Sequence, residues 1–435
     1  QKTRARNAAA VEATDWVNVS EGETEFVGYD STSCPTRILR YRKVSQKNKE
    51  FYQIVLSTTP FYAEMGGQVG DSGWLIDGDE KIEIYDTKRE NGQAVHLSKK
   101  LPSNLEAEFI AQINEANRRA TECNHTATHL LHAALREVLG THVEQKGSYV
   151  SPGMLRFDFS HFQKVTPEEL RKAEHIANAN VRKAIALDEH RHMPIAEALD
   201  MGAMALFGEK YGEDVRVVRY GDSVELCGGT HVPNTGNIGT IRIISESSIA
   251  AGIRRIEAVT AEVAENLVDQ LTDDMRSVGE LLHNAPDVLQ ALRKSIEENT
   301  ELRKQAEEYM QERIRNIARE TLEKAETVNG IKLASLTGIR VPEVVKGVAF
   351  GIRQMSPEMT AFVAATVDMA GKPLLTVALT DDLVKEGHNA SAIVREAAKA
   401  IKGGGGGQPG FAQAGGKDKD GIATAFQSLN NAFRK

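Results

Sequence analysis

The sequence predicts an α+β protein of several domains, and three observations support this fold class. The chain has 435 residues, which is more than one ordinary hydrophobic core organises. Short β-rich runs separated by turn residues fill the first hundred positions, whereas residues 261–328 show a continuous helical pattern. Residues 329–435 hold 15 of the 36 glycines, which marks them as a separate module.

Composition excludes several classes of protein. With 41% hydrophobic and 26% charged residues, the chain resembles neither a disordered tail nor a fibre. The formal net charge of −8 excludes a uniformly basic nucleic-acid coat but not a local basic patch. No apolar run reaches the length of a membrane span, about 18 residues, so we expect no membrane partner. Three scattered cysteines favour a reducing compartment, and we expect a cytoplasmic location.

The first hundred residues are predicted to contain two parts. Residues 1–20 read as the tail of a preceding helix, and no charged-then-apolar leader follows Gln1, so we expect no signal peptide and interpret the chain as part of a longer protein. Residues 21–104 contain short strand-like runs at spacings typical of a small barrel or sandwich, and we predict a β-barrel domain. The runs are residues 25–29, 36–41, 51–56, 81–85 and 94–97.

Residues 105–262 mix helical and strand patterns and are predicted to form one α+β domain. An apolar stripe with three- and four-residue steps predicts a helix over residues 124–139, which Gly140 ends. Thr166 before Pro167 predicts the start of a second helix. Strands are expected at residues 214–220, 238–244 and 255–260.

Residues 263–328 are predicted to form a long helical hairpin or coiled-coil spacer, because narrow apolar stripes flank Pro286 on a heavily charged background. Residues 329–435 form a glycine-rich α/β module whose formal charge is +4, from 13 Lys and Arg against 9 Asp and Glu. Its expected strands are residues 348–352, 361–367 and 374–379. A helix over residues 390–402 then leads into five consecutive glycines.

Two short motifs together predict a metal site. His125 and His129 are four residues apart, so on a helix both imidazoles project from one face. Cys227 and His231 are also four apart, across a Gly-Gly turn that lets the backbone fold back. One thiolate and three imidazoles suit Zn²⁺. The alternative is that the histidines lie on a helix surface and Cys227 is a buried thiol, and His132 near the same face is a possible substitute ligand.

The residues that follow His125 argue against a zinc protease. Such a helix carries Glu directly after its first histidine as a general base, whereas Thr126 stands here. If water is activated at this site, the base comes from elsewhere, and Glu225 or a hydroxyl of the substrate is a candidate. Four protein ligands would fill a tetrahedral zinc ion, which would make the site structural unless one ligand yields or a fifth position opens.

The motifs as a set resemble alanyl-tRNA synthetases. Residues 124–129, 142–148, 155–159, 226–231 and 252–256 resemble the editing domain of that family, and residues 60–68 resemble its small β-barrel. The glycine run and the Gly-Gly pair at 415–416 resemble its C-terminal module, which DHH-family phosphoesterases share. The resemblance extends from about residue 15 to residue 430.

The resemblance implies an editing hydrolase for tRNA(Ala) mischarged with Ser or Gly. A pocket for alanine cannot exclude the smaller glycine and rejects serine only poorly, so a second, hydrolytic site supplies the missing discrimination. The implied zinc ligands are His125, His129, Cys227 and His231. The implied catalytic and substrate-pocket residues are Gln145, Arg156, Asp158, Glu225, Gly228, Gly229 and Thr230.

The resemblance also implies tRNA contacts. Gln145 would contact the aminoacyl group. The alternative interpretation is that Gln145 is a solvent-exposed residue of a strand. Arg254 and Arg255 would hold phosphates of the acceptor end, or else form ion pairs with Glu225 or Glu257. The C-terminal module would bind the outer elbow of the tRNA, although a glycine run can also be a flexible linker. Its implied tRNA-binding residues are Arg395, Lys399, Lys402, Gly403, Gly404, Gly405, Gly406, Gly407 and Lys417.

The chain departs from the whole enzyme because a class II aminoacylation core and a sequence for ATP binding are not recognised in it. We therefore expect hydrolysis without aminoacylation, in cis with a charging domain outside this sequence, and a possible homodimer through the helical spacer. Another interpretation is a tRNA-binding and oligomerisation module with a purely structural zinc. A DHH-type phosphoesterase is disfavoured because the chain contains no Asp-His-His triplet.

Overall fold

The computed structural model describes residues 11–46, 49–205 and 212–434. The chain divides into two compact units, Gln1–Ser277 and Val278–Lys435, which we describe one at a time. Each unit combines helices with β-sheets around its own hydrophobic core, which confirms the predicted α+β multidomain class. None of the helices in the described ranges carries an apolar stretch that would span a bilayer.

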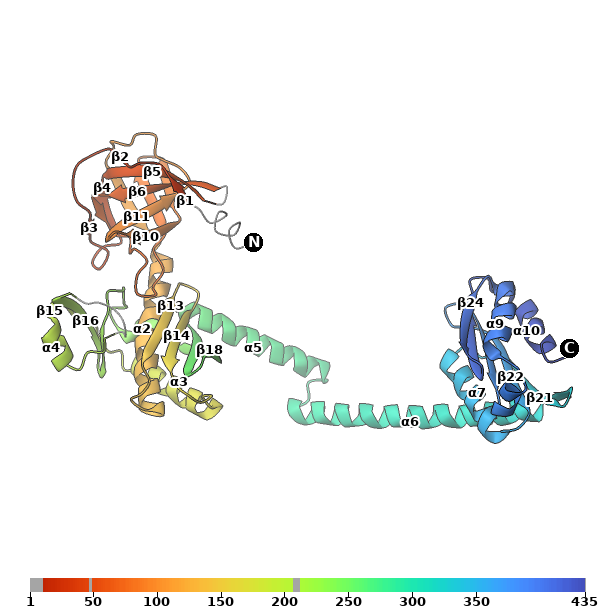
Figure 1. Cartoon of the computed structure of the whole chain (residues 1–435). Coiled ribbons are helices and arrows are strands. Elements are labelled where there is room, and N and C mark those ends of the chain that lie inside the picture. The colour runs from red at the N-terminus through yellow and green to blue at the C-terminus, as the bar shows by residue number, and fades with distance from the viewer. Residues whose placement is uncertain (1–10, 47–48, 206–211, 435) are drawn as a thin grey trace. The chain divides into compact units, whose positions relative to one another are not determined.

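The N-terminal part of the first unit consists of strands in two main sheets (Figure 1). The first sheet has the order β1-β5-β6-β11-β10, with β2 paired to β5, and the second has the order β4-β12-β8-β9. A short parallel pair joins β3 to β7. The strands are β1 (Val11–Ala13), β2 (Val17–Asn18), β3 (Glu25–Phe26), β4 (Ser33–Thr36), β5 (Ile38–Gln46), β6 (Lys49–Leu56), β7 (Thr58–Thr59), β8 (Gly73–Asp77), β9 (Glu80–Ile84), β10 (Asp86–Glu90), β11 (Gln93–Ser98) and β12 (Phe109–Ile113).

The closed β-barrel predicted for this part is wrong. Among the described residues, pairing ends at β1 and β10 in one sheet and at β4 and β9 in the other. Both sheets contribute to one core, with Ile38 and Leu56 from the first and Leu75 and Phe109 from the second. Alternating side chains point into such a core whether or not the ladder closes, so the sequence pattern cannot distinguish a barrel from a sandwich. Strand β12 follows the predicted boundary at residue 104, yet it pairs with β4 and β8.

The remainder of the first unit is built on the antiparallel sheet β13-β14-β19-β18, one face of which packs on the helices α2 and α3. Helix α2 starts before the predicted residue 124 and ends as predicted, where the N–H of Gly140 donates to the carbonyl of Arg136. Thr166 caps α3 in a reciprocal capping box with Glu169. The elements are α2 (Glu115–Leu139), β13 (Gln145–Val150), β14 (Leu155–Ser160), α3 (Pro167–Arg182), β18 (Ile241–Ala250) and β19 (Ile253–Thr260). A small sheet of β15 (Asp188–Pro194), β16 (Asp214–Tyr220) and β17 (Ser223–Leu226), with α4 (Ile195–Asp200), completes this part.

Two helices, α5 (Ala261–Leu281) and α6 (Val288–Glu323), occupy the segment with the long helical pattern. Pro286 lies in the connection between them, as expected for a residue that cannot continue a helix. Many of their apolar side chains are exposed, among them Leu271, Leu281, Leu289, Ile296 and Leu302.

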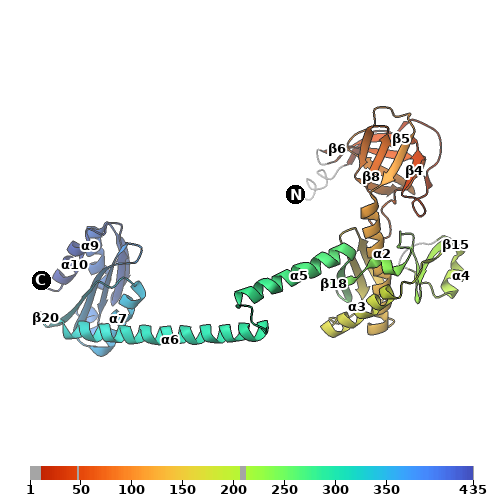
Figure 2. The same cartoon turned by 180° about the vertical axis from the view of Figure 1, so that it is seen from behind.

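The second unit is a six-stranded sheet with helices on both faces. Helix α7 and the end of α6 pack on one face, and α9 and α10 pack on the other, as both views show (Figures 1 and 2). The strand order is β20-β21-β22-β23-β25-β24, and only β21 and β22 run parallel. The elements are β20 (Glu326–Val328), β21 (Ile331–Thr337), α7 (Pro342–Met355), β22 (Thr360–Val367), β23 (Pro373–Leu379), α8 (Asp381–Lys385), α9 (Ala390–Ala398), β24 (Gly404–Gln408), β25 (Phe411–Gly415) and α10 (Ile422–Asn431).

The strand predicted over residues 348–352 is wrong, because this segment belongs to α7. Val344, Val345, Val348 and Ile352 are all buried and recur at helical spacing. A five-residue apolar run cannot by itself distinguish a strand from a buried helix face. The glycine run also has regular structure, since β24 is the edge strand of the sheet.

Candidate metal centre

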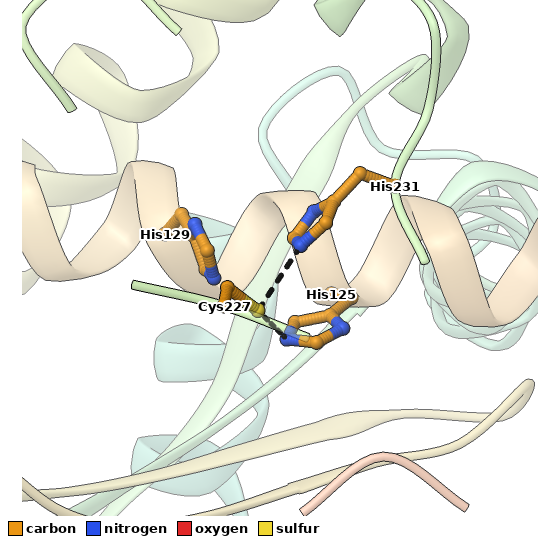
Figure 3. A group of neighbouring side chains, drawn as sticks. All are labelled: His125, His129, Cys227 and His231. Carbon is orange, nitrogen blue, oxygen red and sulfur yellow. Dashed lines mark hydrogen bonds between the residues drawn. The ribbon is translucent and has the colours of Figure 1, made fainter. Parts of the chain in front are cut away.

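Four side chains from two distant segments meet in the first unit (Figure 3). They are His125, His129, Cys227 and His231, and their ligand atoms all lie within 4.8 Å of one another. Cys227 Sγ is 3.4 Å from His125 Nε2 and 3.3 Å from His231 Nε2. The histidine pair projects from one face of α2, while the thiol and the third imidazole lie on the turn after β17.

The turn that carries Cys227 is held by bonds to its carbonyl groups. Arg216 on β16 donates to the carbonyl oxygens of Cys227 and Gly229, each at 2.7 Å. The hydroxyl of Tyr29 donates to the carbonyl of Gly228 at 2.6 Å. Glycine is required at 229 because a Cβ there would lie 2.0 Å from Cε1 of His125. The backbone of the turn therefore approaches the helix closely enough for the four side chains to meet.

Contacts outside the cluster orient two of the imidazoles. His125 Nδ1 lies 2.8 Å from Oε1 of Gln68, and His231 Nδ1 lies 3.1 Å from the hydroxyl of Thr126. In both rings the other nitrogen, Nε2, faces Cys227. Histidines that bind metals commonly donate one ring N–H to such a partner and bind through the other nitrogen.

Burial keeps the three histidines neutral at pH 7. Burial is the main cause that lowers the pKa values of His125, His129 and His231. A neutral imidazole has the free lone pair that metal binding needs.

Burial opposes the ionisation of Glu225, but interactions with His129 and a hydrogen bond from His132 lower the pKa of Glu225 to about 2. A carboxylate thus stands beside the cluster, and His132, which contacts its Oε1 at 3.1 Å, lies outside the ligand group.

The donor set and its spacing fit a zinc ion. Tetrahedral zinc with bonds of about 2.1 Å to nitrogen and 2.3 Å to sulfur separates its ligand atoms by roughly 3.5 Å. The two sulfur–nitrogen separations are close to this value. Imidazole and thiolate are also ligands that zinc prefers over magnesium or calcium. These four residues could therefore hold zinc without a large rearrangement.

The cluster forms part of the wall of a cavity of about 420 Å³. Five segments that are distant in the sequence contribute to it: the loop at residues 62–66, β10, α2, the first half of β13, and the β16–β17 hairpin with its flanking residues. The lining includes Tyr62, Met65, Gly66, Arg89, His125, Thr128, His129, Gln145, Ser148, Arg216, Glu225, Cys227, Gly228 and Gly229. Its volume is in the range typical of small-ligand sites.

The structure brings together some of the predicted pocket residues and not others. Gln145, Glu225, Gly228 and Gly229 line the cavity, and Thr230 is buried beside it, in contact with Gln68. Their chemical roles remain predictions.

Arg156 and Asp158 do not line the cavity. They alternate on β14 with the core residues Leu155, Phe157 and Phe159, so they lie on the other face of the sheet. There the Arg156 guanidinium stacks on the ring of Tyr149, and Asp158 pairs with Arg255.

Carboxylates pair with both arginines of the predicted acceptor-end site. Arg255 donates to both oxygens of Asp158, at 2.6 and 2.7 Å, and Arg254 pairs with Glu246 at 2.5 Å. Ion pairing was the alternative interpretation, but the partners are not the predicted Glu225 and Glu257. Binding of phosphates by these arginines remains a prediction.

The predicted tRNA-binding residues of the second unit gather around the glycine strand. Arg395 on α9 donates to the carbonyl of Gly405 at 3.1 Å, and Lys402 pairs with Asp418 at 2.9 Å. Lys399 pairs with Glu396, and the backbone N–H of Lys417 donates to the carbonyl of Ile401. The five glycines lie in β24 or directly before it.

Four residues that support the cluster or its turn were not predicted from the sequence. Gln68, Thr126, Arg216 and Tyr29 each contact the cluster or its turn. Thr126 was detectable because it lies between the two histidines of one motif, and Gln68 because it ends a Gly-Gly-Gln sequence. No local signal marks Arg216 or Tyr29, because only folding brings them to the turn.

Three family models match parts of the chain. The model for the threonyl and alanyl tRNA synthetase second additional domain matches residues 215–257, which include Cys227 and His231. The model for class II (A) tRNA synthetases matches residues 1–116, and the DHHA1 domain model matches residues 337–435.

Curated relatives match almost the whole chain. An alanine–tRNA ligase from Parabacteroides distasonis is 58% identical over 99% of this chain, and one from Bacteroides fragilis is 55% identical over 99%. The chain spans about half the length of these relatives, 49% in both cases. Among solved structures, the C-Ala domain of the Aquifex aeolicus alanyl-tRNA synthetase is 27% identical, with a TM-score of 0.24, over 26% of this chain and 99% of that one. The chain is therefore homologous, along nearly its whole length, to part of the alanyl-tRNA synthetases.

Proposed function

We propose that this chain removes wrongly attached amino acids from tRNA(Ala), by hydrolysing the ester bond of Ser-tRNA(Ala) and Gly-tRNA(Ala). The observation that carries the proposal is the group of one thiol and three imidazoles, of which His125, His129 and Cys227 line a cavity that Gln145 and Glu225 also line. The relatives named as alanine–tRNA ligases support the choice of tRNA. The need for discrimination against serine and glycine supports the choice of reaction.

The residues of the cavity supply the parts that ester hydrolysis needs. A zinc ion bound by His125, His129, Cys227 and His231 would act as a Lewis acid or lower the pKa of a bound water. Glu225 is ionised at pH 7, and its carboxylate can orient a water molecule by accepting a hydrogen bond from it. The amide of Gln145 can accept a hydrogen bond from the serine hydroxyl, which alanine lacks.

We propose that the second unit binds tRNA. The sequence over residues 329–435 is net positive, and the exposed β24 brings peptide groups without side chains to the surface. Such a strand allows close approach of a nucleic acid backbone, and Arg395, Lys399, Lys402 and Lys417 would supply charge. Arg254 and Arg255 would approach the acceptor end only by exchanging their present carboxylate partners.

The exposed apolar residues of α5 and α6 favour a further part of the proposal. The two helices would bury these residues either by pairing in a helical hairpin or by pairing with a second chain. Pairing with a second chain would give a homodimer, which we place in the cytoplasm. A charging domain in cis would deliver the mischarged tRNA.

A second function is a tRNA-binding module in which zinc is purely structural. The observation that favours it is the four-residue donor set, because four protein ligands fill a tetrahedral zinc ion. In that case the cluster would stabilise the turn at residues 227–231 and would not take part in hydrolysis.

Substitution of Cys227 distinguishes the two functions. Purified full-length chain is assayed for zinc content and for deacylation of Ser-, Gly- and Ala-tRNA(Ala). We expect about one zinc per chain, rapid hydrolysis of the Ser and Gly esters, and slow hydrolysis of the Ala ester. Cys227→Ala should abolish hydrolysis with nearly unchanged tRNA affinity, whereas Cys34→Ala, at a half-buried cysteine on β4, should match the parent. Equal deacylation by Cys227→Ala and the parent would contradict a zinc-centred reaction.

A further inference from the structure

A loop from the N-terminal strands reaches into the candidate metal centre. Residues 60–72 connect β7 to β8, and Gly66 and Gly67 form the centre of a tight turn. Both have positive φ, +59° and +87°, and the N–H of Gln68 donates to the carbonyl of Met65, as in a type I′ turn. A Cβ at Gly67 would lie 2.3 Å from Oγ of Ser148, so glycine lets the loop press against β13.

Helix α2 holds this loop at its ends and near its tip. The guanidinium of Arg118 donates to the carbonyl of Pro60 at 2.8 Å and forms a buried ion pair with Asp71. Seven residues later, two turns along the same face, His125 contacts Gln68. The ion pair is almost inaccessible to solvent, with 3% and 7% of the two side chains exposed, so breaking it would leave a buried charge unpaired.

The hydrogen bonds of Gln68 determine which end of its side-chain amide, the oxygen or the nitrogen, faces His125. Its side chain is fully buried, and its Oε1 accepts from the backbone N–H of Thr230 at 2.9 Å. A backbone N–H is only a donor, so the atom facing it is the oxygen, and the Nε2 group donates to the hydroxyl of Thr230 at 2.9 Å. The same oxygen lies 2.8 Å from Nδ1 of His125, which must therefore carry the proton.

We propose that Gln68 is a positioning residue of the metal site, which sets the tautomer and ring orientation of His125. With its proton on Nδ1, His125 directs the lone pair of Nε2 toward Cys227 Sγ, 3.4 Å away. Through Thr230, Gln68 also links the helix pair of ligands to the turn that carries Cys227 and His231. The N-terminal strands thus complete the site, since the same loop supplies Tyr62, Met65 and Gly66 to the cavity wall. This inference rests on the proposed zinc site.

Zinc affinity of three variants of the full chain tests the proposal, measured by competition with a chromophoric chelator. Gln68→Leu removes the acceptor and should weaken zinc binding 10- to 100-fold, the usual effect of losing such an outer contact. Gln68→Glu keeps an acceptor oxygen for the Nδ1–H of His125 and for the backbone N–H of Thr230. The hydroxyl of Thr230 can donate to the other carboxylate oxygen, so zinc affinity should stay within about threefold of the parent. Gln53→Leu is the matched control, because Gln53 is a buried glutamine on β6 whose partners are Arg42 and Glu90.

Two results would overturn the proposal: parental zinc affinity in Gln68→Leu, or equal weakening in Gln68→Leu and Gln68→Glu. Nitrogen-15 NMR of the histidines in zinc-free protein separates this inference from the zinc proposal. The parent and Gln68→Glu should hold His125 as the Nδ1–H tautomer, and Gln68→Leu should show a mixture. If the parent binds no zinc but shows this tautomer change, the metal proposal fails and the positioning role of Gln68 stands. An unchanged tautomer in Gln68→Leu contradicts that role even where Gln68→Glu is poorly folded.

Discussion

The turn at residues 227–231 and the strand at residues 404–408 are both rich in glycine, but their glycines meet different neighbours. A Cβ on Gly229 would collide with the imidazole of His125, a candidate metal ligand. A Cβ on Gly405 would lie 2.2 Å from the carbonyl oxygen of Gln413, in the paired strand β25. Glycine in the turn makes room for a side chain of the site, whereas glycine in the strand makes room for backbone. Loss of the first should therefore impair function, and loss of the second should impair stability.

The largest effect is expected from Gly229→Ala. The added methyl would displace His125 from the cluster, so zinc affinity and deacylation of Ser-tRNA(Ala) should each fall at least a hundredfold. Isothermal titration with zinc and a deacylation assay measure both. Gly228→Ala is the matched control, because its Cβ would meet only the flexible end of Met65, and it should cost less than tenfold. Comparable losses in the two variants would mean that the close approach to His125 is not the cause.

A smaller effect, on stability rather than chemistry, is expected from Gly405→Ala. The clash with β25 should lower the free energy of unfolding of the second unit by about 2–3 kcal/mol. Denaturant unfolding of the chain measures this loss. Gly404→Ala, which would place its Cβ in open space, should change stability by less than about 0.5 kcal/mol. If the alanine at 404 destabilised as much as that at 405, strand packing would not explain the glycines.

The turn at residues 227–231 should also show a pH dependence, through its contact with Glu122 on α2. Burial raises the pKa of Glu122, which hydrogen-bonds Thr230, to about 7. The unfolded carboxyl titrates near 4.5, so the folded state binds more protons between pH 4.5 and 7. The stabilising contribution of the protonated form is complete below pH 4.5 and is lost as pH rises through 7.

Glu122→Gln should remove this dependence and stabilise the protein at pH 8, relative to pH 5, by about 1–2 kcal/mol after allowance for partial exposure. Thermal unfolding at the two pH values provides the measurement. The same pH dependence in parent and variant would argue against ionisation of Glu122 as its origin.

The smallest effect is expected from Arg255→Ala. Asp158 already accepts hydrogen bonds from Nε and Nη2 of this arginine, so tRNA affinity should fall less than twofold. Asp158→Asn, which weakens that ion pair, is the companion variant and should leave affinity equal or slightly higher. Filter binding at fixed salt measures both. A loss above fivefold for Arg255→Ala would indicate that the arginine exchanges Asp158 for a phosphate.

Local spacing predicted which side chains of the candidate site share a helix face, but it did not predict which face of a strand borders the cavity. Two histidines four apart must share a helix face, so the meeting of His125 and His129 followed from periodicity. The position of Arg156 and Asp158 did not, because alternation on β14 places them on one face without saying which face borders the cavity. The barrel prediction and the strand at residues 348–352 were wrong for a related reason, since a short apolar pattern fits more than one way of burying the same side chains.

By itself, the sequence determined which residue types occur at helical, strand and turn spacing, and therefore the α+β class and the two halves of the candidate ligand set. The tertiary structure decided which distant segments meet: Gln68 with His125, Arg216 and Tyr29 with the turn at 227–231, and Arg255 with Asp158. The physical reason is the separation along the sequence between the residues that make each contact. Backbone geometry dictates contacts within a few residues, whereas contacts across a hundred residues depend on how whole sheets and helices pack.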